Sequence, residues 1–336
     1  MAMENRTPEQ AGKTSGAASS RRHAIALMWG AWRWLPGALG AAESGALAAA
    51  GSGALGAAEP GVPIRMAMSE SIVADVNLND ARVAMLIWIK KIGQELNVVV
   101  EFDPRVFDTS QQIVSRIRRG QLDAVALNII EYRQAANDLD SGQVVCDAGS
   151  FEQCVILAKR DSGFKQLGDL KGRRLCMLKT SKMCIAPAWL ATILDEGHCG
   201  LEEEFFGSVV GDSKVSRVVL PVFFGQADAC LTSKRGFDTM CEMNPQVARD
   251  LSVVASSPLM LASFYIFCKD FPRVSRQKLL GALTSVRIGA AGQQLATLFQ
   301  FGELTVRDAS CMVSALSVLD RAERARGRRG AGGRTG

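Results

Sequence analysis

The feature that most limits the fold of this chain is a regular alternation, from residue 63 onward, of short apolar runs with segments of helical periodicity. Apolar runs at residues 64–68, 98–102 and 122–127 are separated by stretches in which apolar residues recur every three or four positions. This pattern predicts an α/β protein with mostly parallel sheets, because strands that alternate with helices favour parallel crossover connections. The first three runs then form one β-α-β-α-β unit.

A second unit of the same kind is expected in the middle of the chain. Its strands are predicted at residues 155–158, 174–178, 208–210 and 227–231, and its helices at 181–194 and 214–224. Two more strands and then only helices follow, at residues 251–255, 263–268, 274–288, 292–299 and 307–325. A chain that returns to the first lobe in this way would form a two-segment hinge near residues 149–156 and 252–262, with a ligand bound between two lobes.

The start of the chain has the composition of a secretory signal peptide. Residues 1–59 begin with polar sequence, continue through Arg21 and Arg22, and end in an apolar, Ala- and Gly-rich stretch. Small residues before Pro60 predict cleavage there, by the Sec or the twin-arginine route. Arg33 interrupts the apolar stretch, which argues against a spanning helix. The alternative is a disordered arm of low complexity.

The remaining boundaries follow from composition and element order. The first part of lobe 1 is expected at residues 60–150, lobe 2 at 151–252, the return to lobe 1 at 253–320 and a disordered basic tail at 321–336. The tail carries six Arg and one Glu, so its charge of +5 equals the net charge of the whole chain. A nucleic-acid-binding face would need basic residues on the folded part and aromatic residues for stacking, and the chain has only two Tyr. Nucleic acid is therefore not an expected partner.

Cysteine and histidine usage argues against an enzyme or a metal site. The nine cysteines include no C-x-x-C pair and lie mostly among apolar neighbours, as buried small hydrophobic residues do. His23 and His198 are the only histidines, so neither a His-rich metal site nor a cofactor is expected. Cys184, near the start of a predicted helix, is the best candidate nucleophile, but no base is in evidence to activate it.

Polar residues at predicted strand ends form the candidate ligand site. Thr180, Ser181 and Lys182 follow a strand and open a helix, so hydroxyl and free N–H groups converge there on one point. This predicts an anion site, although either hydroxyl could simply cap the helix. Ser69 and Asn128 end the first and third strands, and each could donate to a ligand or be an ordinary loop residue.

Three stretches carry a family resemblance: RGQLDAVA at residues 119–126, QLGDLKGRR at 166–174 and FGQADA at 224–229. With Thr180 and Ser181 between the last two, they resemble the phosphate, phosphite and phosphonate substrate-binding proteins of ABC transporters, which have the type II periplasmic-binding fold. The resemblance covers residues 64–319. It implies a periplasmic protein that closes two lobes on a small oxyanion, serves a permease and an ATPase, and meets the membrane only through the permease. A sensor that reports to a membrane receptor or histidine kinase is the alternative.

The resemblance also implies roles for single residues. Asp228, placed at the end of a parallel strand, would accept a hydrogen bond from a protonated ligand oxygen, unless it is a solvated or capping residue. Tyr132 would face the cleft or pack on the sheet. Ser110 and Leu127 stand where phosphonate binders carry aromatic residues, and residues 212–214 replace a segment that contains His, which favours inorganic phosphate over an organic phosphonate. The predicted ligand-binding set is Ser69, Ser110, Asn128, Tyr132, Thr180, Ser181, Lys182 and Asp228.

Overall fold

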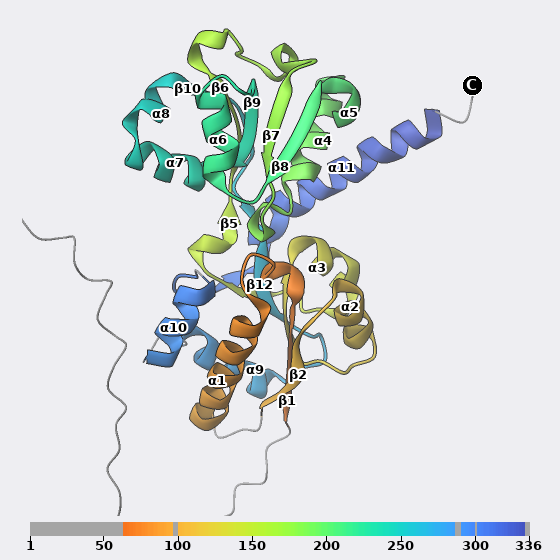
Figure 1. Cartoon of the computed structure of the whole chain (residues 1–336). Helices are drawn as coiled ribbons and strands as arrows, with labels where there is room; N and C mark the ends of the chain where they lie inside the picture. Colours follow the sequence, from red (N-terminus) through yellow and green to blue (C-terminus); the bar gives the residue numbers. More distant parts are fainter. Residues whose placement is uncertain (1–62, 97–99, 286–289, 300, 333–336) are drawn as a thin grey trace, which may run out of the picture. The chain divides into compact units, whose positions relative to one another are not determined.

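The computed structural model describes residues 63–96, 100–285, 290–299 and 301–332. Their strands form a six-stranded sheet, a five-stranded sheet and a small two-stranded sheet (Figure 1). The α/β class predicted from the sequence is confirmed. The predicted export signal and its cleavage site at residues 1–59 lie outside the described residues.

The six-stranded sheet, called the first sheet below, has the strand order β13-β4-β12-β3-β1-β2. Strand β1 pairs in parallel with β2 and β3, as the alternating pattern predicts. Strand β12 runs antiparallel to β3 and β4, and β13 runs antiparallel to β4. The bounds are β1 (Ile64–Ser69), β2 (Val100–Asp108), β3 (Ala124–Asn128), β4 (Gln143–Cys146), β12 (Ser263–Phe267) and β13 (Thr305–Asp308).

The five-stranded sheet, called the second sheet, has the order β10-β6-β9-β7-β8. Strand β7 is parallel to β8 and β9, whereas β6 is antiparallel to β9 and β10. Both large sheets are therefore mixed and not mostly parallel, because the strands on either side of the crossovers enter their sheets in the opposite direction. The bounds are β6 (Cys154–Lys159), β7 (Arg174–Leu178), β8 (Ser208–Asp212), β9 (Ala229–Ser233) and β10 (Leu251–Ser256).

Two chain segments cross between the sheets. They pair as the antiparallel strands β5 (Phe151–Glu152) and β11 (Met260–Leu261), within the two segments where a hinge was predicted. The predicted return at residue 253 is wrong, since β10 pairs with β6 along the edge of the second sheet. The chain leaves that sheet only after Ser256, and the first strand back in the first sheet is β12.

Helices cover the sheets, and side-chain caps fix where several of them begin. The Asn77 carboxamide oxygen accepts the Asn79 N–H at 2.9 Å, so Asn77 caps the first helix. Thr109 and Gln112 form a capping box at the second helix. The bounds are α1 (Leu78–Leu96), α2 (Ser110–Arg118), α3 (Ile129–Ala135), α4 (Ala186–Glu196), α5 (Glu202–Phe205), α6 (Val215–Phe223), α7 (Lys234–Met243), α8 (Pro245–Asp250), α9 (Arg273–Thr284) and α10 (Ala290–Phe299).

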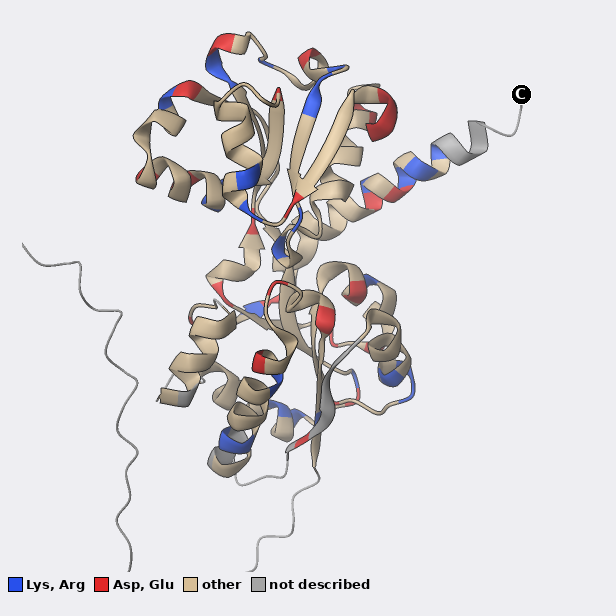
Figure 2. Ribbon diagram, viewed as in Figure 1, with Lys and Arg blue, Asp and Glu red and all other residues tan. Residues whose placement is uncertain are grey.

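The basic tail, predicted to be disordered, is helical as far as it is described. Helix α11 (Val313–Gly332) packs against α4, with Ala322 and Ala325 each only 2% exposed. Arg321 pairs with Glu196 on α4, and Figure 2 shows acidic and basic residues in succession along α11. Small side chains let the two helices approach closely, and this packing outweighs a composition that favours disorder.

Alternation along the strands divides the core. On β1, Met66 and Met68 belong to a cluster with Trp88 of α1, whereas Ala67 faces the other side of the sheet. On β3, Ala124 and Ala126 face the Trp88 side and Val125 and Leu127 the other. Successive side chains of a strand point to opposite faces, so helices pack on both sides of this sheet.

Replacing Gly207 with alanine is expected to lower the free energy of unfolding by about 2 kcal/mol. A Cβ atom at Gly207 would lie 2.5 Å from the Gly172 carbonyl oxygen, so the backbone would have to shift. Gly168→Ala is the matched control, because a Cβ there meets nothing within 4 Å. Urea unfolding of both variants measures the difference, and equal midpoints would contradict the prediction.

Candidate functional site

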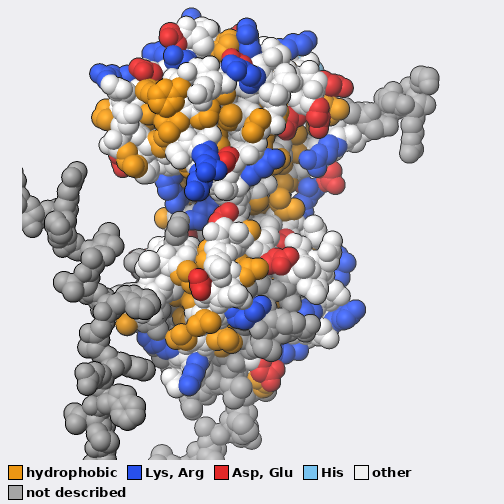
Figure 3. All heavy atoms as spheres, in the orientation of Figure 1, with side chains coloured by type: hydrophobic (Ala, Val, Ile, Leu, Met, Phe, Trp, Pro, Cys, Tyr) orange, Lys and Arg blue, Asp and Glu red, His pale blue; other side chains and the backbone are white. Residues whose placement is uncertain are grey.

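A cavity of about 990 Å³ lies where side chains from both large sheets meet. Its lining includes Thr180, Ser181 and Lys182 of the predicted anion site, which follow β7. Figure 3 shows Lys and Arg side chains beside apolar ones next to the hollow between the two sheets. The charged residues of the lining balance in number, with three carboxylates and three cations: Asp75, Asp147, Glu152, Lys182, Lys214 and Arg235.

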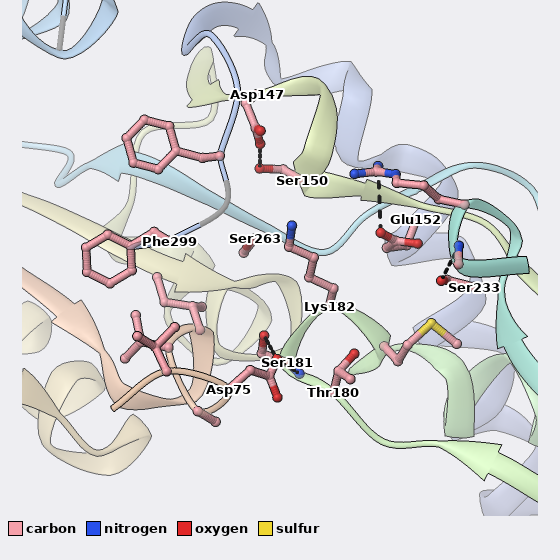
Figure 4. Close-up of a pocket in the computed structure, with 18 of the residues that line it drawn as sticks. Asp75, Asp147, Ser150, Glu152, Thr180, Ser181, Lys182, Ser233, Ser263 and Phe299 are labelled. Carbon is pink, nitrogen blue, oxygen red and sulfur yellow. Dashed lines mark hydrogen bonds and ion pairs between the residues drawn. The ribbon is translucent and has the colours of Figure 1, made fainter. Parts of the chain in front are cut away.

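The Ser181 donors converge as predicted, and a carboxylate of the chain accepts from them. The Asp75 Oδ2 atom accepts the Ser181 N–H at 2.9 Å and the Ser181 hydroxyl at 2.6 Å (Figure 4). Asp75 lies in the turn between β1 and α1, on the side of the first sheet. Two donors aimed at one carboxylate oxygen form the kind of charge-assisted contact that also holds phosphonate or phosphate oxygens.

The helix expected at Thr180 begins later than predicted. Residues Ser181–Met183 form a single 3₁₀ turn, and α4 starts at Ala186. Thr180 precedes the turn and makes no side-chain capping bond, so its hydroxyl is not used as a cap. The donors at this point therefore come from the turn itself, and not from the first turn of a long helix as predicted.

Lys182 points into the cavity, toward the side on which Asp147, Ser150 and Glu152 lie (Figure 4). Burial of Asp147 opposes its ionisation, but hydrogen bonds from the Gly302 N–H at 2.6 Å and the Ser150 hydroxyl at 2.6 Å, with the nearby charge of Lys182, lower its pKa. Asp147 is thus an anion held in place by donors, and it attracts the Lys182 ammonium.

Glu152, in the crossover strand β5, faces Arg235 of α7. Burial raises the pKa of Glu152, and the charges of Arg235 and Lys182 partly offset this. The Arg235 guanidinium lies 3.7 Å from the Glu152 carboxylate and donates to the Phe151 carbonyl at 3.0 Å. Arg235 belongs to α7, beside the second sheet, so this contact ties that sheet to the β5 crossover.

Three other predicted site residues surround a buried carboxylate instead of lining the cavity. Glu131, only 2% exposed, accepts the Ser69 hydroxyl at 2.5 Å, the Asn128 N–H at 3.0 Å and the Ser110 hydroxyl. Ser71 adds a fourth donor at 2.9 Å. The strand-end hydroxyls do gather at one point, as expected, but a side chain of α3 uses them. We call this group the Glu131 cluster.

Tyr132 packs in the core. Its side chain is 7% exposed and its ring meets the Phe264 ring edge-on, with centroids 5.5 Å apart. The cleft-facing alternative is wrong, because Tyr132 projects from α3 onto β12 and lies outside the cavity lining.

Asp228 is a structural residue at the wrong end of its strand for ligand binding. It precedes β9, whose carboxyl end is Ser233, and it accepts the Arg174 N–H at 2.8 Å and the Arg174 Nε at 3.0 Å. Asp123, which precedes β3, binds Arg65 of β1 in the same way, at 2.7 Å and 3.0 Å. The repeated G-Q-x-D-A sequence thus joins two parallel strands in each sheet, and Ser233 takes the strand-end position in the cavity.

The variant Asp228→Asn is expected to bind ligand within about twofold of wild type while its Tm falls by about 2 to 4 °C. The hydrogen bond from Arg174 lowers the pKa of Asp228. A lowered pKa stabilises the fold above the ordinary Asp pKa of 3.8, and this contribution is lost as pH falls below that value. Melting curves from pH 7 to pH 3 check this. Asp123→Asn is the matched variant, because Asp123 binds Arg65 in the same way as Asp228 binds Arg174. A large loss of affinity would return Asp228 to the ligand site.

The cavity has an aromatic wall that the sequence did not reveal. Phe299 and Phe301, at the end of α10 and after it, line the cavity together with Phe264 of β12. The predicted lack of aromatic residues rested on Ser110 and Leu127 alone. These aromatic side chains supply an apolar surface, and Ile72 also lines the cavity.

The cysteine thiols and the possible metal ligands of the described residues were candidates for nucleophilic or metal chemistry. Burial raises the pKa of the Cys184 thiol to about 12, which opposes formation of a thiolate. All nine cysteines lie within the described residues and are free thiols. Among the described residues no group of His, Cys, Asp or Glu is placed to hold a metal ion. Within the same ranges, none of the helices combines the length and apolar character needed to cross a bilayer.

Comparison with known proteins identifies a matching family model. The model describes the phosphonate ABC transporter periplasmic substrate-binding protein and matches residues 73–310 of this chain. No curated protein matches the chain in sequence.

Solved structures resemble this chain at low sequence identity. XAC2383 from Xanthomonas citri, solved with bound ATP, is 14% identical with a TM-score of 0.55, over 78% of this chain and 98% of that chain. PhnD1 from Prochlorococcus marinus, solved with methylphosphonate, is 14% identical with a TM-score of 0.49, over 78% and 97%. A binding-protein component of an ABC phosphonate transporter from Pseudomonas aeruginosa is also 14% identical, with a TM-score of 0.49 over 78% and 87%. The family match over residues 73–310 confirms the predicted periplasmic-binding fold.

Proposed function

The chain belongs to the family of periplasmic substrate-binding proteins of phosphonate ABC transporters, and we propose that it binds a small phosphonate in the cavity between its two large sheets. The observation that carries this proposal is the convergence of the Ser181 N–H and hydroxyl on one carboxylate oxygen. Donors that hold one oxygen anion also suit the oxygens of a phosphonate. Thr180 and Lys182 add a hydroxyl and a positive charge beside them.

The aromatic wall supports an organic phosphonate over inorganic phosphate. Phe299 and Phe301 form an apolar surface that an inorganic anion would not use. An alkyl group on phosphorus would lose water against this surface and gain about 25 cal/mol per Å² of buried area. The substituent would therefore point to the first sheet and the oxyanion to Ser181.

Binding is proposed to close two lobes about a hinge. The first lobe is built on the first sheet and the second lobe on the second sheet, and the crossover strands β5 and β11 form the hinge. A ligand that touches both lobes stabilises the closed form because it binds that form more tightly. The closed protein then delivers its ligand to an ABC permease driven by an ATPase. Export by the signal at residues 1–59 places it in the periplasm.

Calorimetric titration of the full-length chain tests the ligand class. Methylphosphonate, phosphate, phosphite and sulfate are titrated separately. We expect saturable binding of one ligand per chain, tightest for methylphosphonate. Binding of sulfate alone would redirect the proposal to sulfonates and sulfate, and heat-silent titrations with all four, confirmed by unchanged melting temperatures, would refute it.

A further inference from the structure

We propose that Asp75 is a tethered competitor at the oxyanion position of the site: its carboxylate holds the Ser181 donors in the free protein, and a ligand oxyanion binds by replacing it. This inference rests on the proposed function. It assigns to Asp75 control over ligand affinity in the cavity.

The first step of the argument is the position of Asp75. Its carboxylate approaches Ser181 from a point 106 residues away in the chain, and both residues line the cavity (Figure 4). The same oxygen accepts both the N–H and the hydroxyl of Ser181. A carboxylate oxygen carries negative charge and accepts hydrogen bonds as a phosphonate oxygen does, so the two compete for one place.

The second step is the contrast with the Glu131 cluster. Glu131 is buried, and it receives hydrogen bonds from Ser69, Ser71, Ser110 and the Asn128 backbone. Glu131 also lies outside the cavity lining, so a ligand in the cavity does not compete for these donors. Asp75 is exposed and receives both of these bonds from Ser181. On release its carboxylate returns to water, which makes it replaceable.

The third step is the cost of replacing a tethered group. Asp75 is held near Ser181 by the turn before α1, so it competes at a high effective concentration. In the free protein, Ser181 is either bound to Asp75 or released from it, and only the released form can bind the ligand. The apparent Kd of the ligand therefore rises in proportion to the ratio of the bound form to the released form. The Asp75 charge also repels an incoming anion at close range. Removing the carboxylate should therefore strengthen binding, although most substitutions in a binding site weaken it.

The contact has a consequence in the absence of ligand. It joins the turn before α1, on the first sheet, to the turn after β7, on the second sheet. It thus holds the two sides of the cavity together through two hydrogen bonds. Loss of the carboxylate should expose the Ser181 amide to solvent, where hydrogen exchange detects it.

Hydrogen exchange on the full-length chain without ligand is the first test. In Asp75→Ala the Ser181 amide should exchange at least about tenfold faster than in wild type. Glu70→Gln is the matched control, because it removes one exposed charge from the same segment outside the cavity lining, and it should match wild type. An unchanged exchange rate in Asp75→Ala would overturn the inference.

Titration with methylphosphonate is the second test. Asp75→Ala and Asp75→Asn should bind at least about tenfold more tightly than wild type, with Glu70→Gln within about twofold. Equal or weaker binding by both Asp75 variants, with wild type still binding, would overturn the competition and leave the proposed function standing. If wild type and all variants fail to bind any of the four oxyanions, the proposed function fails and the competition with it.

Discussion

Replacing Glu131 with alanine is expected to lower the free energy of unfolding by about 3 to 5 kcal/mol, the largest stability effect of a single substitution outside the apolar core. Glu131 accepts hydrogen bonds from Ser69, Ser71, Ser110 and the Asn128 backbone at the ends of β1 and β3 and the start of α2. Without the carboxylate these donors face a cavity in a buried region. Chemical denaturation measures the change.

Two further variants separate charge from packing at the Glu131 cluster. Glu131→Gln keeps the shape of the side chain and one acceptor oxygen, so about half of the loss is expected. Glu70→Ala removes an exposed carboxylate nearby and should change stability by less than about 0.5 kcal/mol. A loss below about 1 kcal/mol in Glu131→Ala would show that water satisfies the donors equally well.

The double variant Thr180→Val/Ser181→Ala is expected to weaken binding of a confirmed phosphonate ligand by at least about 30-fold. Both hydroxyls lie in the cavity, and a hydrogen bond to a charged acceptor contributes about 1.5 kcal/mol or more. The Ser181 N–H is kept, which limits the loss. The hydroxyl also donates to Asp75, so its removal weakens the competing contact and offsets part of the effect.

The matched control for that double variant changes the same residue types away from the cavity. Ser115→Ala/Thr297→Val changes one side chain on α2 and one on α10. Neither Ser115 nor Thr297 lines the cavity, so affinity should stay unchanged. Calorimetry on both proteins, with melting curves to verify folding, makes the comparison. Full-strength binding by the Thr180 and Ser181 variant would remove those residues from the site.

The repeated G-Q-x-D-A sequence shows how a correct pattern led to a wrong role. The stretches at residues 119–126 and 224–229 both contain it, and in both sheets it precedes a strand. The family resemblance predicts a ligand-binding role for Asp228 and none for Asp123. In the structure both make the same bonds to an Arg on a neighbouring parallel strand, Asp123 to Arg65 and Asp228 to Arg174. The repetition itself was the available signal for a shared structural role.

Another local signal was present for the Glu131 cluster. Asn128 and Glu131 have the spacing of a capping box, and the structure shows both of its bonds at the start of α3. That spacing predicts a helix directly after β3 and directs the Glu131 carboxylate back toward the strand end. The arrangement of four donors around Glu131 could not be predicted from the sequence. Ser69, Ser71 and Ser110 come from segments whose relative placement depends on the whole first sheet.

The α/β repeat, its parallel β-α-β units, two crossovers and a polar turn at Thr180–Lys182 follow from the residues alone, because periodicity acts over a few residues. What that turn faces depends on contacts between segments far apart in the chain. Asp75 reaches Ser181 across 106 residues, and Arg235 reaches Glu152 at the crossover. Such contacts are set by the packing of the two sheets and the return of the chain through β12, which no local pattern encodes.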